Sequence, residues 1–430
     1  MAKILKFIIF IIIIIFPFGQ LTKIPLGMAG VNLYLQDLVI SLLVFFWLFW
    51  HLLIRKPFLK TPLSLPIFSF IGVTFFSLAV NFGYLGSLGF LGSLACFLYL
   101  FRWAIYAGLY FVIYELTRDT LLKLLSLAGL LVAILGLLQY SFYPNLRNLD
   151  YLGWDPHQNR LFGTFFDPGF TGIILVLTMM LLLCQDLHIT RHPEFSSGSI
   201  NKGILNQVQN DIGVVLVFLA LLFTYSRSSY LALTGGMIVL AWLRKSVKYL
   251  IFPLLAFLFI GVNCFWFPSV SEGMKLERTS TIQARWENYK QSFKIIGDHP
   301  FFGVGFNTLR FVKKDYGFLE NDWQEMHSGA GLDNSLLFVW ATTGIVGLGV
   351  YLWMWWKTAQ NSKLKAQSYN LKVKTKKNQR QRKNFNFCLL SSIIVLFIHS
   401  FFLNSLFYPW VMVWMWVLLG VNYHSLEEYK

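Results

Sequence analysis

Long, uninterrupted apolar runs follow one another along most of this 430-residue chain, and this feature limits the fold more than any other. Each run approaches the roughly 20 apolar residues that a helix needs to cross a membrane. Only 13% of the residues are charged, against about 25% in soluble domains. This composition excludes a soluble enzyme and a disordered chain. Because the runs are continuous and do not alternate, an outer-membrane barrel is also excluded. The sequence therefore predicts an all-α, polytopic integral membrane helical bundle.

The apolar runs predict about 12 transmembrane helices in a single membrane domain, residues 1–430. No small-residue cleavage site follows the first run, which favours an anchored helix over a cleaved signal peptide. The four cysteines lie inside apolar runs, at spacings that suggest neither a metal site nor a disulfide framework. The predicted spans are 3–19, 35–54, 63–81, 95–117, 121–143, 168–187, 212–226, 229–243, 249–267, 333–356, 386–403 and 406–423.

The distribution of Lys and Arg predicts the orientation, because cytoplasmic loops are enriched in them. Ten basic residues and no acidic residue fall between Lys357 and Lys383. With both termini in the cytoplasm, this stretch becomes a basic cytoplasmic loop, 357–385, which we expect to lie against anionic lipid headgroups. The polar loop 188–211 also faces the cytoplasm and is interpreted as an insertion without chemistry. The net charge of +16 is thus an orientation signal, and no nucleic-acid partner is predicted.

The largest loop on the opposite, outer side is 268–332, between the ninth and tenth predicted spans. Its eight basic and eight acidic residues balance. Two further polar stretches lie on the same side. Arg160 comes just before the sixth span, where it is either functional or an interfacial arginine that snorkels to the membrane surface. Arg227 joins two short helices with almost no loop, so we expect it near membrane depth, where a guanidinium needs a partner or a watery cavity.

The outer loop contributes two more stretches. Residues 282–296 have helical spacing, with Arg285 beside a stripe formed by Trp286, Tyr289, Phe293 and Ile296. Gly303 and Gly305 follow, and they permit either tight backbone geometry or close approach to a ligand. His327 and Asp333 then precede the tenth span. The plain alternatives are a solvated loop histidine for His327 and a helix cap for Asp333, together with Asn334.

Four stretches follow one another along the chain: RLFGTFFDPGFTG, TYSRSSYLAL, RWENYKQSFKIIGDHPFFGVGFNTL and DNSLLFVWATTGIVGL. In this order, they resemble the O-antigen ligase and O-antigen polymerase superfamily. The closing segment NSLFYPWVMVWMWVLLG also fits. The resemblance covers roughly residues 155–425. Each string alone is of modest specificity, but four in order on one membrane face are more specific.

The resemblance implies a GT-C-type glycosyltransferase of the bacterial inner membrane that works on the periplasmic or outer face. Such enzymes take a glycan from undecaprenyl diphosphate and transfer it to a glycan or lipid acceptor, in lipopolysaccharide or other cell-surface polysaccharide synthesis. The family uses no metal and no further cofactor. Its outer arginines bind the diphosphate, and Arg160, Arg227 and Arg285 match those motifs.

One position departs from the family pattern. The family's proposed catalytic base is a histidine in a His-Asn-Ser string, whereas this chain has Asp333 at that place and a histidine six residues earlier, His327. Either residue can accept the proton of the acceptor hydroxyl. The imidazole, with an ordinary pKa near 6.5, is the better match to neutral pH than a carboxyl near 3.9. Asp333 is then the better candidate for positioning the acceptor.

Three other functions fit a membrane protein with outer arginines. A transporter or flippase for a lipid-linked or anionic substrate also uses intramembrane charge, but it more often has internal repeats and broken helices. A peptidoglycan-type polymerase shares the lipid carrier, but its motifs do not match these strings. A purely structural role is the third. The sequence separates neither ligase from polymerase nor one donor sugar from another.

Overall fold

The computed structural model describes residues 1–24, 32–54, 61–116, 119–185, 197–266, 279–319, 331–372 and 376–424. Most of this part of the chain is helical, and β1 (Lys23–Ile24) pairs antiparallel with β2 (Leu33–Tyr34). The α-helices are α1 (Ala2–Ile15), α2 (Leu35–Leu53), α3 (Ser64–Val80), α4 (Phe82–Ser87), α5 (Gly89–Glu115), α6 (Asp119–Phe142), α7 (Pro168–Gln185), α8 (Ser197–Phe223), α9 (Arg227–Arg244), α10 (Ile251–Trp266), α11 (Thr279–Asp298), α12 (Leu309–Asp315), α13 (Ser335–Lys372), α14 (Lys376–Ser400) and α15 (Pro409–His424).

Seven helices in the described ranges are long and apolar enough to cross a membrane. They match seven of the predicted spans, and four shorter apolar helices coincide with the predicted spans that begin at 63, 168, 212 and 406. The remaining prediction, 229–243, falls on α9. The all-α membrane class is thus confirmed, whereas the count of 12 spans stays a prediction.

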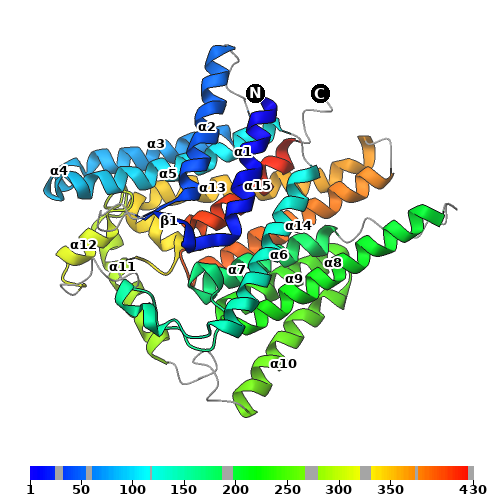
Figure 1. Cartoon of the computed structure of the whole chain (residues 1–430). Helices are drawn as coiled ribbons and strands as arrows, with labels where there is room; N and C mark the ends of the chain where they lie inside the picture. Colours follow the sequence, from blue (N-terminus) through cyan, green and yellow to red (C-terminus); the bar gives the residue numbers. More distant parts are fainter. Residues whose placement is uncertain are drawn as a thin grey trace.

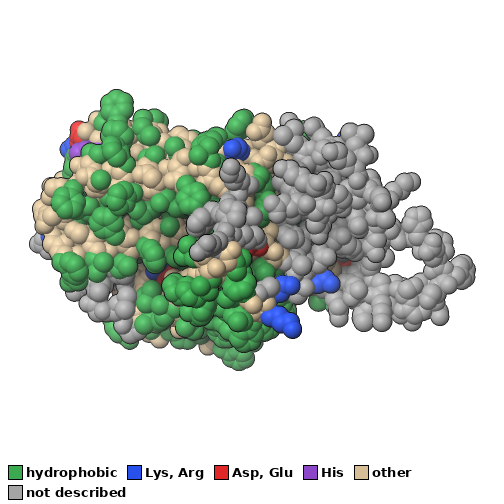
Figure 2. Space-filling model, turned by 90° about the horizontal axis from the view of Figure 1, so that it is seen from above, with side chains coloured by type: hydrophobic (Ala, Val, Ile, Leu, Met, Phe, Trp, Pro, Cys, Tyr) green, Lys and Arg blue, Asp and Glu red, His purple; other side chains and the backbone are tan. Residues whose placement is uncertain are grey.

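Hydrophobic side chains also cover the outside of the bundle. Phe45, Phe68 and Phe142 are more than half exposed, and Figure 2 shows hydrophobic side chains spread over the described part of one face, with few charged groups among them. Large exposed apolar surfaces on a soluble protein would mark interaction sites. Over so many helices they indicate the lipid-facing surface of a membrane protein.

The centre of the bundle is α15, whose residues from Pro409 to Tyr423 are all buried. A helix that is apolar on every side belongs in a core. It packs along α5, while α14 packs against α9, α7 and α13 (Figure 1).

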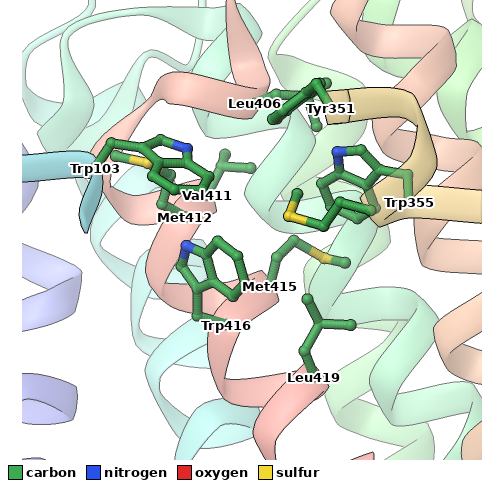
Figure 3. A pocket seen from close by; sticks show the side chains of 10 residues that line it. Trp103, Tyr351, Trp355, Leu406, Val411, Met412, Met415, Trp416 and Leu419 are labelled. Carbon is green, nitrogen blue, oxygen red and sulfur yellow. The ribbon is translucent and has the colours of Figure 1, made fainter. Parts of the chain in front are cut away.

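A small apolar pocket lies between α5, α13 and α15, and Figure 3 shows Trp103, Trp355 and Trp416 among its lining side chains. Its walls offer almost no polar surface, so we assign no chemistry to it.

Two glycines let the outer loop pack directly onto α13. Gly344 interrupts that helix with a φ of +66°, and a Cβ there would meet the carbonyl of Phe301 at 2.0 Å. Gly303 has a φ of +64°, and a Cβ would meet the backbone of Thr342 at 2.4 Å. The neighbouring residue, Val304, donates its N–H to the carbonyl of Ala341 at 3.0 Å. Of the two alternatives for the Gly303 turn, the structure therefore supports tight backbone geometry.

The predicted basic loop 357–385 is largely helical in the structure. Helix α13 continues to Lys372 and α14 begins at Lys376. Lys, Arg and Gln are good helix formers, so they extend the two flanking helices. Figure 1 shows these ends of α13 and α14 on the opposite side of the bundle from α11 and α12. Helices α11 and α12 are thus separated from these basic helix ends, while the orientation itself stays a prediction.

Candidate functional site

Arg160 lies against the turn between α8 and α9. Its Nε donates to the carbonyl of Thr224 at 3.1 Å, and its Nη2 donates to the carbonyl of Tyr225 at 3.2 Å. The last carbonyls of a helix lack partners within the helix, and a cation is favourable there. The backbone of Leu161 adds a bond to the carbonyl of Phe223 at 2.8 Å. Two stretches about 64 residues apart in sequence are therefore fastened together, and Arg160 holds the turn that precedes Arg227.

Arg227 is the first residue of α9, and its side chain is exposed. Ser226 caps this helix by accepting from the backbone N–H of Ser229. Tyr225 has a φ of +48°, a left-handed conformation that is uncommon for a bulky residue. Helix α8 ends at Phe223, so the prediction of two helices with almost no loop between them is confirmed. The result is an exposed guanidinium at a helix N-terminus, where backbone N–H groups and the helix dipole favour an anion.

A buried histidine, which the sequence analysis missed, supports the start of α9. Nε2 of His399 lies 3.3 Å from Oγ of Ser228 and 3.4 Å from Oγ of Ser229. Its Nδ1 lies 2.6 Å from Oγ of Ser405. His399 is fully buried, and Arg285 is within electrostatic range of it. A histidine inside an apolar span was the available signal, since ionisable residues there are costly and tend to be functional.

Arg285 and Asp333 face each other across the gap between α11 and α13. Nε of Arg285 lies 4.0 Å from Oδ2 of Asp333, and the two side chains are 32% and 41% exposed. Helix α11 confirms the helical spacing predicted for 282–296. The residues of its predicted stripe are not buried together. Ile296 is buried, whereas Trp286 and Phe293 are more than half exposed. An arginine and a carboxylate are thus paired at a position that a ligand can reach.

Asn334, rather than Asp333, caps helix α13. Its Oδ1 accepts from the backbone N–H groups of Leu336 at 2.9 Å and Leu337 at 3.0 Å. The plain account of Asp333 as a cap is therefore wrong, since the amide of Asn334 already satisfies these N–H groups. The carboxylate of Asp333 is left to face Arg285. Partial burial raises the pKa of Asp333, against the opposing charges of Arg285 and Lys313, and Asp155 acts in the same direction as burial.

Lys313, which the sequence analysis counted only as one basic residue of the outer loop, is completely buried in α12. Its Nζ donates to the carbonyl of Gly331 at 3.0 Å and to Oδ1 of Asn288 at 3.2 Å. Burial lowers the pKa of Lys313 to about 8, against the opposing charge of Asp333. The Lys313–Lys314 pair is typical of a solvated surface, so the sequence carried no signal for this role.

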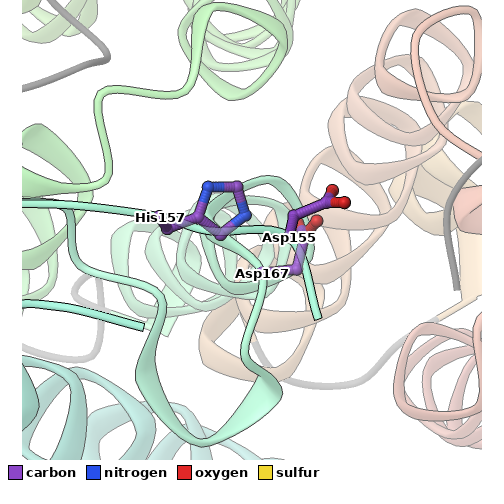
Figure 4. Close-up of side chains that lie close together, drawn as sticks. All are labelled: Asp155, His157 and Asp167. Atoms are coloured by element: carbon purple, nitrogen blue, oxygen red, sulfur yellow. The ribbon is translucent and has the colours of Figure 1, made fainter. Parts of the chain in front are cut away.

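Asp155, His157 and Asp167 form a third cluster, which Figure 4 shows in close-up. One potential ligand atom of each lies within 4.8 Å of the others. Asp167 caps α7, because its Oδ1 accepts from the N–H of Phe170 at 2.8 Å. Burial raises its pKa, and Arg160 acts in the opposite direction. With one carboxylate committed to a cap and Asp155 exposed, the cluster is an incomplete ligand set, and we assign no metal to it.

Asp155 lies within electrostatic range of both Asp167 and Asp333, and its charge raises the pKa of each. Hydrogen bonds join the stretches of Arg160 and Arg227, and an ion pair joins Arg285 to Asp333. The two groups lie within electrostatic range of each other through His399 and Asp155. His327 lies outside the described residues. The choice of His327 or Asp333 as base, like the diphosphate-binding roles of the arginines, stays a prediction.

Comparison with known protein families identifies a match within the chain. Residues 212–352 match the model of the family described as O-antigen ligase. The matched segment contains Arg227, Arg285, Lys313 and Asp333, whereas Arg160 lies before it. A comparison with curated proteins finds no significant match to the chain. The resemblance to the O-antigen ligase and O-antigen polymerase superfamily is confirmed by the family match.

Proposed function

Because the chain carries an O-antigen ligase domain over residues 212–352, we propose that it is a membrane glycosyltransferase of polysaccharide biosynthesis. The proposed reaction moves a glycan from undecaprenyl diphosphate to an acceptor, either a lipopolysaccharide core or the next lipid-linked repeat unit. The proposed location is the bacterial inner membrane, with both termini in the cytoplasm, 12 spans and the site on the outer face. Membrane lipids surround the bundle.

The observation that carries the proposal is the meeting of Arg285 with Asp333, 4.0 Å apart and both partly exposed. The leaving diphosphate gains negative charge as its bond to the sugar breaks, so preorganised positive groups stabilise the transition state. A guanidinium binds phosphate oxygens through two parallel hydrogen bonds and stays charged at every working pH. Arg227 supplies a second guanidinium at the N-terminus of α9. Charge stabilisation by these groups is the reason that we propose a metal-independent reaction.

The proposed step is a substitution at the anomeric carbon. The acceptor hydroxyl forms the new C–O bond, and the bond between the anomeric carbon and the diphosphate oxygen breaks, so that undecaprenyl diphosphate leaves with the electron pair. The acceptor proton passes to Asp333 or to His327. A carboxylate with a raised pKa holds a transferred proton better than an ordinary one, and this favours Asp333 more than the sequence alone did. In this scheme Arg160 holds the turn that presents Arg227.

The test uses purified full-length protein in nanodiscs. The donor is lipid-linked glycan extracted from source cells that lack the gene, in which unconsumed donor should accumulate. Wild-type protein should release undecaprenyl diphosphate when a lipopolysaccharide core or a second portion of lipid-linked glycan is added. The product formed with each acceptor distinguishes a ligase from a polymerase. Movement of intact donor across a liposome membrane, with no release of undecaprenyl diphosphate, would instead identify a transporter.

A further inference from the structure

A buried lysine, Lys313, lies next to the proposed site and takes no direct part in the proposed reaction. Helix α12 buries Leu309, Val312 and Lys313 and exposes Lys314. Lysine is almost never fully buried unless it is paired, because removing its charge from water is costly. The complete burial of Lys313 therefore needs an explanation in its partners.

Those partners form a closed triangle. Nζ of Lys313 donates to the carbonyl of Gly331 at 3.0 Å and to Oδ1 of Asn288 at 3.2 Å. Nδ2 of Asn288 donates to the same carbonyl at 3.4 Å. The triangle joins three separate elements: α11, α12 and the segment that enters α13.

Both members of the reactive pair are attached to this triangle. Gly331 lies two residues before Asp333, so fixing its carbonyl limits where the carboxylate can lie. Asn288 lies three residues after Arg285 on α11, and residues at this spacing share one face of a helix. Lys313 is thus hydrogen-bonded to the two elements that carry Arg285 and Asp333. Within the described part of the chain, it forms no hydrogen bond with the side chain of either residue.

We propose that Lys313 is a positioning residue, whose buried ammonium group holds the Gly331 carbonyl and the Asn288 side chain and thereby fixes Asp333 opposite Arg285. The inference rests on the proposed function, since it concerns the geometry of that same pair. A misplacement of about 1 Å can reduce a reaction rate by about 10²-fold. Loss of the ammonium group should therefore lower turnover although it contacts no reacting atom.

The charge of Lys313 also acts on the site. The charge that acts on Lys313 is that of Asp333, in the segment before α13. Asp333 is itself within electrostatic range of Arg285 on α11 and of Asp155 in the segment before α7. On α12 itself, the neighbouring charged residues are Arg310, Lys314 and Asp315. Because the pKa of Lys313 is about 8, its charge is present below this pH and is lost above it. The position of Asp333 should loosen over the same range.

The experiment compares Lys313→Met, Lys313→Arg and the matched control Lys314→Met in the nanodisc transfer assay, from pH 6 to pH 9.5. Wild type should lose turnover as the pH rises through about 8. Lys313→Met should have a kcat about 10- to 100-fold lower, with a smaller change in KM and without this alkaline limb. Lys313→Arg, which stays charged, should recover part of the kcat and keep it above pH 8. Lys314→Met should match wild type.

The outcomes separate the two proposals. A wild-type protein that releases no undecaprenyl diphosphate from the donor contradicts the proposed function. Active wild type with an unchanged kcat and pH profile in Lys313→Met overturns the inference alone. If Lys313→Met does not elute as a monodisperse protein, Lys313→Arg decides. An alkaline limb that stays near pH 8 in Lys313→Arg also overturns the role of Lys313.

Discussion

Nε of Arg285 lies 4.0 Å from Oδ2 of Asp333, across the gap between α11 and the start of α13. This pairing gives the two residues complementary roles. The guanidinium can receive the negative charge of a leaving diphosphate, and the carboxylate can receive the proton of an attacking hydroxyl. Asn334 makes this arrangement possible by capping α13, which leaves Asp333 free of that duty.

Removal of Arg227, which is exposed, or Arg285, which is partly exposed, should slow glycan transfer strongly. We expect Arg285→Ala and Arg227→Ala each to lower kcat by about 10²–10³, the usual effect of losing one preorganised donor to developing charge. Lysine at either position should restore only part of the rate, because it lacks the planar fork. The measurement is the rate of transfer at equal protein abundance. Lys290→Ala, on the exposed side of α11, is the control, and wild-type turnover in Arg285→Ala would refute this role.

Replacement of Arg160 should act on stability as well as on donor binding. Its two hydrogen bonds hold the Thr224–Tyr225 turn, and bonds from a charged donor contribute about 1.5–3 kcal/mol each. Arg160→Ala should therefore lower the thermal unfolding temperature in detergent and weaken binding of undecaprenyl diphosphate, with a smaller effect on turnover at saturating donor. An Arg160→Ala protein that melts at the wild-type temperature would show that the turn does not depend on this residue.

Asp333→Asn should separate catalysis from folding. If Asp333 is the base, the substitution should lower kcat by about 10²–10⁴ and abolish an acidic limb that lies above the ordinary carboxyl pKa near 3.9. Retention of that limb, together with its loss in His327→Ala, would transfer the role of base to His327.

The stability of Asp333→Asn gives an independent readout. Because burial raises the pKa of Asp333 in the folded state, its contribution to stability is fully present below the unfolded pKa and is lost as the pH rises through the folded pKa. At neutral pH the asparagine protein should thus be no less stable than wild type. Asn334→Ala, which removes the cap, should lose about 0.5–2 kcal/mol of unfolding free energy. The reverse order of stability would mean that Asp333, and not Asn334, supports the helix.

Cysteine labelling tests the predicted orientation. Tyr151 is 80% exposed in the segment before α7, and Val247 is 79% exposed in the turn between α9 and α10. In a chain whose four native cysteines are replaced, a membrane-impermeant maleimide should label Tyr151→Cys in spheroplasts and should label Val247→Cys only after the membrane is opened. Labelling in the opposite order would place the arginines on the cytoplasmic face and contradict the proposed donor.

Hydropathy predicted the all-α membrane class and the positions of the long apolar helices, because the membrane imposes one length scale on every spanning helix. The orientation inferred from charge stays a prediction. The spacing at 282–296 likewise predicted α11, since an amphipathic period is a local property. The helical continuation of α13 to Lys372 was missed. A run of Lys, Arg and Gln is compatible with both a loop and a helix, and charge alone does not decide between them.

The chemistry-bearing contacts were harder to predict, because they join residues far apart in the sequence. Arg285 and Asp333 were both identified as candidates, but their pairing depends on how the 300–305 turn packs onto the break in α13 at Gly344. The sequence predicted both Asp333 and Asn334 as caps of the tenth span, because Asp and Asn both commonly cap helices. Lys313 was overlooked because its burial is fixed by tertiary packing. The position of His399 inside an apolar span was a signal that was not used.

The central claim is that Arg285 and Asp333 form one reactive pair acting on a diphosphate-linked glycan, and a double-mutant cycle tests it most directly. Release of undecaprenyl diphosphate from lipid-linked donor is measured for wild type, Arg285→Ala, Asp333→Asn and the double variant. Residues that act as a unit are strongly non-additive, so the double variant should be about as slow as the slower single variant. Release at the wild-type rate in both single variants, or losses that simply multiply in the double variant, would contradict the account.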